Sequence, residues 1–121
     1  MKRNFELYKL KRNIQRNGSS FVFRRKKTNS FGEKTKEYEE NVYEIKGIYH
    51  ENVSYIKQKA SEDAEWRSKK TPMILTSFDE SINLNIGDVV KISDKDFLIT
   101  GIENIRQENI ICDISLEIVL N

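Results

Sequence analysis

The sequence has few of the residues that usually cross-link a fold or perform catalysis. Its 121 residues include one Cys, one Pro, one His, one Trp and five scattered Gly. A single cysteine, Cys112, excludes an intrachain disulfide. No apolar run approaches the roughly 20 residues of a membrane span, and residues 1–16 lack the uninterrupted apolar core of a secretory signal. We therefore expect a chain that folds in a reducing cytoplasm and does not enter a membrane.

The sequence also contains few candidate catalytic or metal-binding groups. His50 is the only histidine, and the spacing around it indicates no catalytic or metal-binding partner beyond the adjacent Glu51. The glycines do not form a phosphate-binding loop, and paired acids such as Glu39-Glu40 lie in polar segments where solvation is the ordinary explanation. The sequence predicts a protein that is not an enzyme and needs no metal or cofactor.

Charge is distributed unevenly along the chain. The net charge is +2, but residues 1–27 carry ten of the 21 Lys and Arg and one of the 19 acids, a local charge of +9. The remaining residues carry −7. This split indicates either a basic arm for nucleic acid or complementary surfaces that meet between subunits, with an unpartnered solvated face as the plain alternative.

The basic segment begins with a predicted helix over Asn4–Asn17, in which Asn4 is a possible N-cap and Gly18 a stop. Leu7, Leu10 and Ile14 form a narrow apolar stripe, so this helix is expected to lie on a surface with its other faces free.

Two strands follow the helix. Ser20–Arg25 alternates, with Phe21 and Phe23 on one side. The polar stretch 26–37 contains the turn signal Asn29-Ser30-Phe31-Gly32 and is expected to join a long hairpin. Asn41–Tyr49 is the second strand, with Gly47 at a bulge or a close backbone approach.

The segment His50–Thr71 is the least regular part of the sequence. Connections of this length in a compact domain are usually functional or partly helical, and its structure stays open here. Pro72 is expected to begin the next strand, Met73–Leu75, where a missing amide hydrogen is tolerated.

The last third, residues 86–120, predicts a three-strand antiparallel meander. Alternating Ile82–Ile86 leads into a tight turn at Gly87-Asp88, and strands at Val89–Ile92 and Phe97–Ile102 follow. In residues 110–120 the even positions are Ile, Cys, Ile, Leu, Ile and Leu, whereas the odd positions include Asp113, Ser115 and Glu117. The even face is expected in a core, with Cys112 as a small buried hydrophobe.

Together these elements predict one mainly β domain over residues 1–121, a small antiparallel SH3-like or OB-like barrel. Residues 1–18 form the basic N-terminal helix, 19–49 and 72–120 the barrel, and 50–71 a long projecting loop. Within that loop, Trp66 beside basic residues is either a lid on the core, an anchor for a partner or a neighbour of phosphates. The candidate loop contacts are Lys57, Lys59, Trp66, Arg67, Lys69 and Lys70.

Five segments resemble small neck proteins of tailed bacteriophages, the head-closure or head-tail connector proteins called stoppers, as in phages and prophage-like elements of Gram-positive bacteria. They are residues 29–33 (NSFGE), 43–51 (YEIKGIYHE), 67–75 (RSKKTPMIL), 86–88 (IGD) and 112–117 (CDISLE). The resemblance covers roughly residues 20–120. It implies a structural virion protein, a β-barrel that forms a six- or twelve-fold cyclic homo-oligomer around the DNA channel at the head-tail interface.

The resemblance also implies partners: a portal or adaptor protein on the head side, a tail-terminator or tail-tube protein on the tail side, and non-specific contact of the loop with channel DNA. Such a protein is made in the host cytoplasm and resides in the virion neck. The candidate basic docking segment is Lys9, Lys11, Arg12, Arg16, Arg24, Arg25, Lys26 and Lys27, and the candidate acidic subunit-interface positions are Asp113 and Glu117. The alternatives are a tail-terminator-type ring protein and a cytoplasmic SH3-like or OB-like module that binds nucleic acid.

Overall fold

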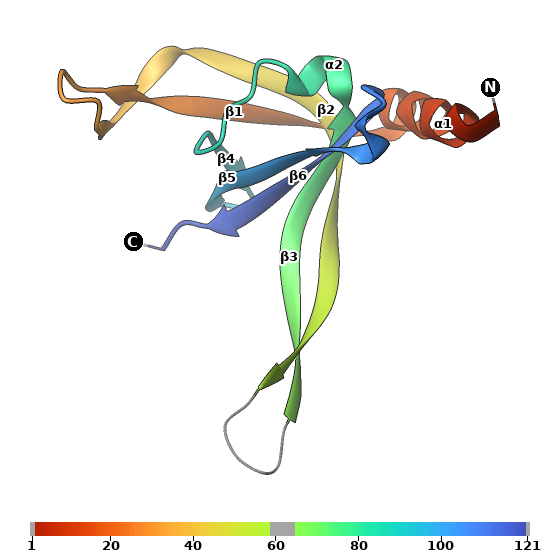
Figure 1. Cartoon of the computed structure of the whole chain (residues 1–121). Helices are drawn as coiled ribbons and strands as arrows, with labels where there is room; N and C mark the ends of the chain where they lie inside the picture. Colours follow the sequence, from red (N-terminus) through yellow and green to blue (C-terminus); the bar gives the residue numbers. More distant parts are fainter. Residues whose placement is uncertain (1, 59–64, 121) are drawn as a thin grey trace.

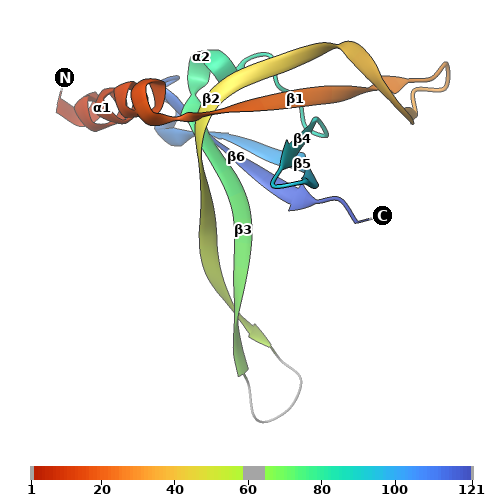
Figure 2. The same cartoon turned by 180° about the vertical axis from the view of Figure 1, so that it is seen from behind.

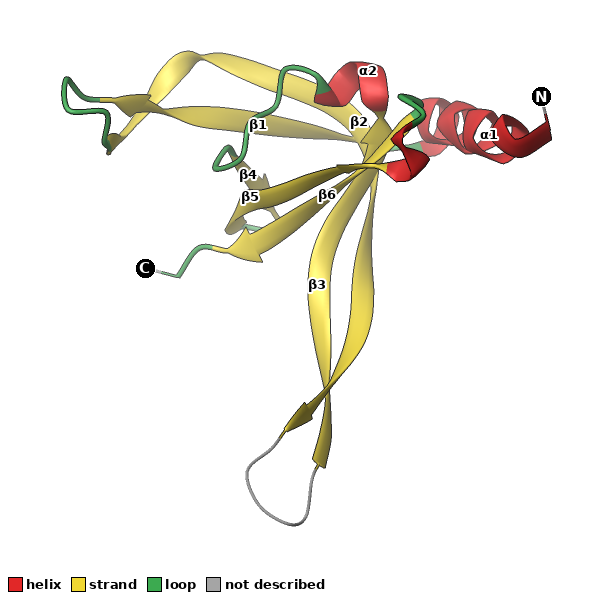
Figure 3. Ribbon diagram, viewed as in Figure 1, coloured by secondary structure: helices red, strands yellow, loops and turns green. Residues whose placement is uncertain are grey.

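The computed structural model describes the backbone of residues 2–58 and 65–120 and the side chains of residues 5–53 and 70–120. Within these ranges six strands form a closed antiparallel barrel in the order β1-β2-β3-β6-β5-β4 (Figure 1). The elements are α1 (Lys2–Asn17), β1 (Ser19–Thr28), β2 (Lys34–Gln58), β3 (Glu65–Ser77), α2 (Phe78–Ser81), β4 (Val89–Ile92), β5 (Lys95–Asn104), the 3-10 turn η1 (Ile105–Gln107) and β6 (Ile111–Ile118). The mainly β barrel with an N-terminal helix is confirmed (Figure 3).

The barrel closes around side chains that alternate along each strand. Phe23, Ile74, Ile99 and Ile114 are fully buried, as the period of two requires for the inner face of a barrel. In β6 the predicted even face is buried at Cys112, Ile114 and Leu116 but not beyond, since Ile118 is 38% and Leu120 83% exposed. On the even face, the predicted burial therefore holds from Ile110 to Leu116 and fails at Ile118 and Leu120.

Helix α1 packs on the outside of the barrel and makes a second core. Leu7 and Ile14 are buried there with Ile110 and Ile111, while Leu10 is partly buried. Ile111 occupies an odd position of β6, which the alternation assigned to the solvent face; α1 covers that position instead. The predicted surface helix with its apolar stripe is confirmed. It begins at Lys2 and not at Asn4, so Asn4 lies inside the helix and is not its N-cap.

Two glycines lie at close backbone approaches, Gly18 where α1 ends beside β2 and Gly47 where β2 meets β3. The Gly18 amide donates to the Ile14 carbonyl at 2.8 Å and ends the helix. A Cβ at Gly18 would lie 2.5 Å from the Ile14 carbonyl oxygen and 3.0 Å from that of Gly47. A Cβ at Gly47 would lie 2.5 Å from Ile74 Cγ2 and 2.9 Å from the Leu75 carbonyl oxygen. The predicted close backbone approach at Gly47 is confirmed.

The predicted C-terminal meander is confirmed, because β4, β5 and β6 are consecutive neighbours. Ser93 and Asp94 both have positive φ, 51° and 65°, which is the backbone of a tight hairpin turn between β4 and β5. The alternation in residues 82–86 does not make a strand. Phe78–Ser81 forms the short helix α2, which sequence reasoning missed, and turns follow it, with Leu84 alone buried in the core.

The segment 50–71, whose structure the sequence left open and which was assigned to a long projecting loop, is strand at residues 50–58 and 65–71. There β2 and β3 stay paired in register from Glu51 opposite Pro72 to Gln58 opposite Glu65. They form a two-stranded ribbon that points away from the barrel (Figures 1 and 2). Chain connectivity explains the outcome, because two strands of one hairpin can extend their own ladder wherever the side chains tolerate solvent on both faces.

Pro72 was expected at the start of a strand, but it lies inside β3. Pairing of β3 with β6 covers only Met73–Ser77, so Pro72 stands where that second ladder ends. Proline has no amide hydrogen, and the position at the end of a ladder is one that tolerates its absence. The ribbon, defined here as residues 51–58 and 65–72, has no strand neighbour on either edge within the described part of the chain.

Candidate functional surfaces

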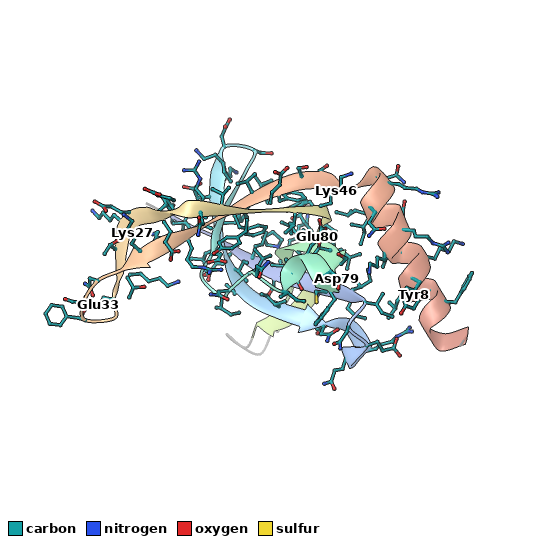
Figure 4. All side chains as sticks on the ribbon, turned by 90° about the horizontal axis from the view of Figure 1, so that it is seen from above. Tyr8, Lys27, Glu33, Lys46, Asp79 and Glu80 are labelled. Atoms are coloured by element: carbon teal, nitrogen blue, oxygen red, sulfur yellow. The ribbon has the colours of Figure 1, made fainter. Side chains whose placement is uncertain are left out.

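The structure divides the eight predicted docking cations into paired and unpaired groups. Lys11 makes a 3.0 Å ion pair with Asp79 of α2, and Lys27 lies 3.9 Å from Glu37 across the β1–β2 hairpin. Lys9, Arg12 and Arg16 are exposed on α1, and Arg24 is exposed on β1. Lys27 of β1 lies at the opposite end of the barrel from α1, so the predicted docking cations are spread over two elements (Figure 4).

Arg25 is a structural residue of the barrel. Its Nε and Nη2 donate to the two carboxylate oxygens of Asp88 at 2.9 Å each, a bidentate geometry. The same guanidinium lies 4.5 Å from the centre of the Tyr43 ring and donates to the Asn83 carbonyl at 2.8 Å. The hydrogen bond to Asp88 raises the pKa of Arg25. Its inclusion among the surface docking cations was wrong.

Asp88 was missed as the partner of Arg25. The residue is fully buried, and its Oδ2 also accepts from the Asn85 amide at 2.9 Å. The pair lies beside the shortest seam of the barrel, where β1 contacts β4 only through Phe23 with Val90 and Arg24 with Val89. An acid between apolar residues, as in Ile86-Gly87-Asp88-Val89-Val90, is the sequence signal that could have indicated a buried partner.

The two predicted acidic interface positions differ. Asp113 is only 16% exposed, and its Oδ1 lies 2.9 Å from His50 Nε2, so it has a partner within the chain. His50 and Asp113 come from β2 and β6, which flank β3. Glu117 is exposed and remains a candidate for a neighbour. The placement of His50 as a structural or surface residue fits this contact.

Five of the six candidate loop contacts lie on the ribbon. In the ladder, Lys57 stands opposite Trp66, and Arg67 stands opposite Ile56. Lys69 stands opposite Ser54, and Lys70 opposite Val53. The side chains of Lys57, Trp66, Arg67 and Lys69 and the whole of Lys59 lie outside the described residues. Lys70 is exposed.

A groove that sequence reasoning missed opens where the ribbon leaves the barrel. The strands β3 and β6 separate beyond the Met73–Ser115 pair, and a space of about 570 Å³ lies in this fork. Apolar groups from four strands line it: Tyr49, Pro72, Phe97, Leu116 and Ile118. Burial raises the pKa of Tyr49. Glu117 and Lys70 border the same groove, so the fork is the place where predicted loop and acidic residues meet.

Cys112 and the acids form no ligand cluster within the described part of the chain. No group of three His, Cys, Asp or Glu side chains there is placed to hold a metal ion. Cys112 is buried beside Ser81, with Oγ and Sγ 3.2 Å apart, and burial raises the pKa of its thiol. Its prediction as a small buried hydrophobe is confirmed.

None of the helices over residues 2–58 and 65–120 combines the length and the apolar character that crossing a bilayer requires. Comparison with protein-family models gives no match to this chain. Comparison with curated proteins gives no match either.

Proposed function

We propose that this protein is a structural component of the neck of a tailed bacteriophage, a ring-forming head-closure or head-tail connector protein. The proposal rests on the sequence resemblance given above and on one structural observation, the projecting ribbon. In this role the protein performs no chemistry. Its barrel is a rigid subunit, and its projections contact neighbouring copies or the proteins above and below the ring.

The ribbon carries the proposal because it has little to stabilise it within one chain. An isolated two-stranded ribbon is marginally stable in water, since neither face is buried and both edges are unpaired. Here Val53 is 46% exposed and Tyr49, at the root, 39% exposed. A ring supplies what is lacking, because each copy offers the adjacent copy a surface or a strand edge for the ribbon to cover.

The β1–β2 hairpin gives independent support. It extends to the opposite end of the molecule from α1 (Figures 1 and 2). Its turn is ordered by Asn29, whose Oδ1 accepts from the amides of Phe31 and Glu33 at 2.9 Å each. This turn holds Phe31 at 86% exposure. In the proposed ring, this side chain is a candidate contact with a neighbouring copy.

The oligomeric state and the assembly role are tested separately. For the first, light scattering and negative-stain imaging of the full chain should show a closed ring, whereas a monomer at high micromolar concentration contradicts the ring. For the second, a phage that encodes the protein is complemented with a variant in which residues 54–69 are replaced by Asn-Gly. We expect an intact barrel, because pairs up to Val53–Lys70 remain, and heads that fill but fail to join tails or retain DNA.

A fourfold substitution gives a finer version of the same test. Replacing Trp66, Arg67, Lys69 and Lys70 together should leave the fold intact and impair joining or DNA retention. The matched control replaces Lys34, Lys36 and Lys91, exposed cations away from the ribbon and from the groove at its root. Normal DNA-filled, tailed particles from the fourfold variant would refute the role of the ribbon. Particles without the protein that carry overlong tails would instead indicate a tail terminator.

A further inference from the structure

The face of α1 that points away from the barrel carries a row of cations. Lys9, Arg12 and Arg16 recur at helical spacing on the side opposite the buried Leu7 and Ile14, and all three are exposed. At 1.5 Å rise per residue, the row extends about 10 Å along the helix axis. Figure 4 shows α1 beside the barrel, with side chains projecting from its free side. We call these three residues the cation row.

The cation row is not neutralised within the described part of the chain. Lys11, one position away from Arg12, makes its ion pair with Asp79, but no ion pair joins Lys9, Arg12 or Arg16 to a described acid. Glu6 is the one acid in α1. Three exposed positive charges within one helical face create a local potential that attracts a polyanion.

The row is also held in a fixed position relative to the barrel. The helix is fixed by its buried stripe, by the Lys11–Asp79 pair and by Lys46 Nζ, which donates to the Gln15 carbonyl at 3.0 Å. The cations therefore project from a helix that is already fixed, so binding costs little backbone conformational entropy. Tyr8 is 51% exposed near the row, and its hydroxyl is a neutral donor of the kind that contacts phosphates.

We infer that the cation row of α1 binds the phosphate backbone of duplex DNA without reading its sequence. An acidic protein is the competing ligand, but the arrangement fits it less well. Protein interfaces are depleted of Lys and place aromatic residues at their centre. Here Lys9 belongs to the row, and the exposed aromatics Phe5 and Tyr8 lie toward the N-terminal end of the helix rather than at the centre of the row. Phe5 has no part in a phosphate contact, which makes it a control. This inference does not depend on the ring or on a neck location.

The test measures binding of the full chain to a fluorescent 20-base-pair duplex of arbitrary sequence, by anisotropy over a range of salt concentrations. The variant Lys9→Gln/Arg12→Gln/Arg16→Gln removes the row. The matched control, Lys36→Gln/Lys91→Gln/Lys95→Gln, removes three exposed cations on strands or turns and lowers the net charge equally. Thermal unfolding confirms that both variants are folded, as expected for exposed side chains.

We expect the row variant to bind roughly 10- to 100-fold more weakly at low salt. The slope of log affinity against log salt should fall by about 2.7, because each neutralised phosphate contributes about 0.9. The control should change affinity less than about threefold, and Phe5→Ala should leave it unchanged. Four outcomes overturn the inference. Three come from direct binding: no DNA binding by the natural chain at 50 mM salt, equal losses in both triple variants, or a loss in Phe5→Ala as large as that of the row variant. Polyglutamate that competes as well as unlabelled DNA, charge for charge, overturns it in favour of an acidic protein.

Discussion

The strands β2 and β3 each run through two different environments, the barrel and the ribbon. Comparing the two shows which part of the molecule determines its stability and which part is available for interaction. Within the barrel, β2 lies between β1 and β3, and Ile45 is 3% exposed while Ile74 of β3 is fully buried. Beyond Tyr49 the same two strands continue as the ribbon, where Val53 is half exposed and neither edge is paired within the described residues. The barrel part is held by burial and the ribbon part only by its own ladder.

This difference assigns distinct tasks to the two parts. Burial of apolar area is the dominant favourable term in folding, so the barrel determines whether the chain folds. The ribbon contributes little to that free energy and is correspondingly free to be shaped by partners. Substitutions in the barrel should therefore change the free energy of unfolding, whereas substitutions in the ribbon should change assembly. Three predictions follow this division, beginning with the largest effect.

The reaction rate of a thiol should differ more between the barrel and the ribbon than any other property tested. Native Cys112 is buried and its thiol pKa is raised by burial, so at pH 8 it presents less of the reactive thiolate and reacts only when the barrel opens. In a Cys112→Ala background, Val53→Cys places a thiol on the ribbon, where Val53 is 46% exposed. We expect the ribbon thiol to react with a disulfide reagent about 1,000-fold faster, given typical domain stabilities. Absorbance of the released chromophore measures both rates.

Both thiols should react at the same rate in concentrated denaturant, which controls for intrinsic reactivity. Equal rates in the native protein would show that the barrel opens as readily as the ribbon. That result would remove the distinction on which the division of tasks depends.

Glycine substitutions test the barrel side of this contrast at the backbone, with the exposed β1–β2 turn as the comparison. Gly47→Ala places a Cβ 2.5 Å from Ile74 Cγ2 and 2.9 Å from a backbone oxygen that cannot move cheaply, so we expect a loss of about 3 kcal/mol in the free energy of unfolding. Gly32→Ala is the comparison, because a Cβ there meets nothing within 4 Å. Its only cost is the positive φ of 80°, about 1 kcal/mol. Urea denaturation measures both, and a Gly32→Ala variant that loses as much as Gly47→Ala contradicts the ranking.

Sequence reasoning found the parts of the fold where periodicity and burial coincide. Leu7, Leu10 and Ile14 in α1 and the alternation around Ile114 in β6 are local patterns that one buried face imposes. The ribbon was missed because no buried face imposes an apolar period where its side chains are described: Glu51, Asn52, Val53 and Lys70 are all exposed. The burial of Ile111 was missed because it depends on α1, which packs from the other end of the chain.

The sequence predicted which types of residue form the candidate surfaces, but not which of those residues stay exposed and which pair within the chain. Composition indicated a basic N-terminal segment, yet only tertiary structure shows that Arg25 turns toward Asp88, 63 positions later, while Arg12 and Arg16 stay exposed. Likewise, Asp113 looked like a free outer acid until barrel closure brought His50 to it. Pairings of this kind depend on the order of strands around the barrel, which local patterns do not specify.

The smallest of the three effects concerns the Arg25–Asp88 pair beside the short β1–β4 seam. Asp88→Asn keeps the size of the side chain and its acceptor for the Asn85 amide but removes the charge that Arg25 contacts twice. Because the Arg25 side chain is 20% exposed and keeps the Asn83 carbonyl as a partner, we expect a loss of about 2 kcal/mol in the free energy of unfolding rather than the full cost of a deeply buried pair.

Asp94→Asn, the same change on an exposed turn, should leave the free energy of unfolding unchanged within about 0.5 kcal/mol. A double-variant cycle with Arg25→Gln isolates the coupling between the two side chains. A coupling near zero would mean that the pair only fills space at the seam, and that burial of Phe23 and Val90 alone keeps β1 and β4 together.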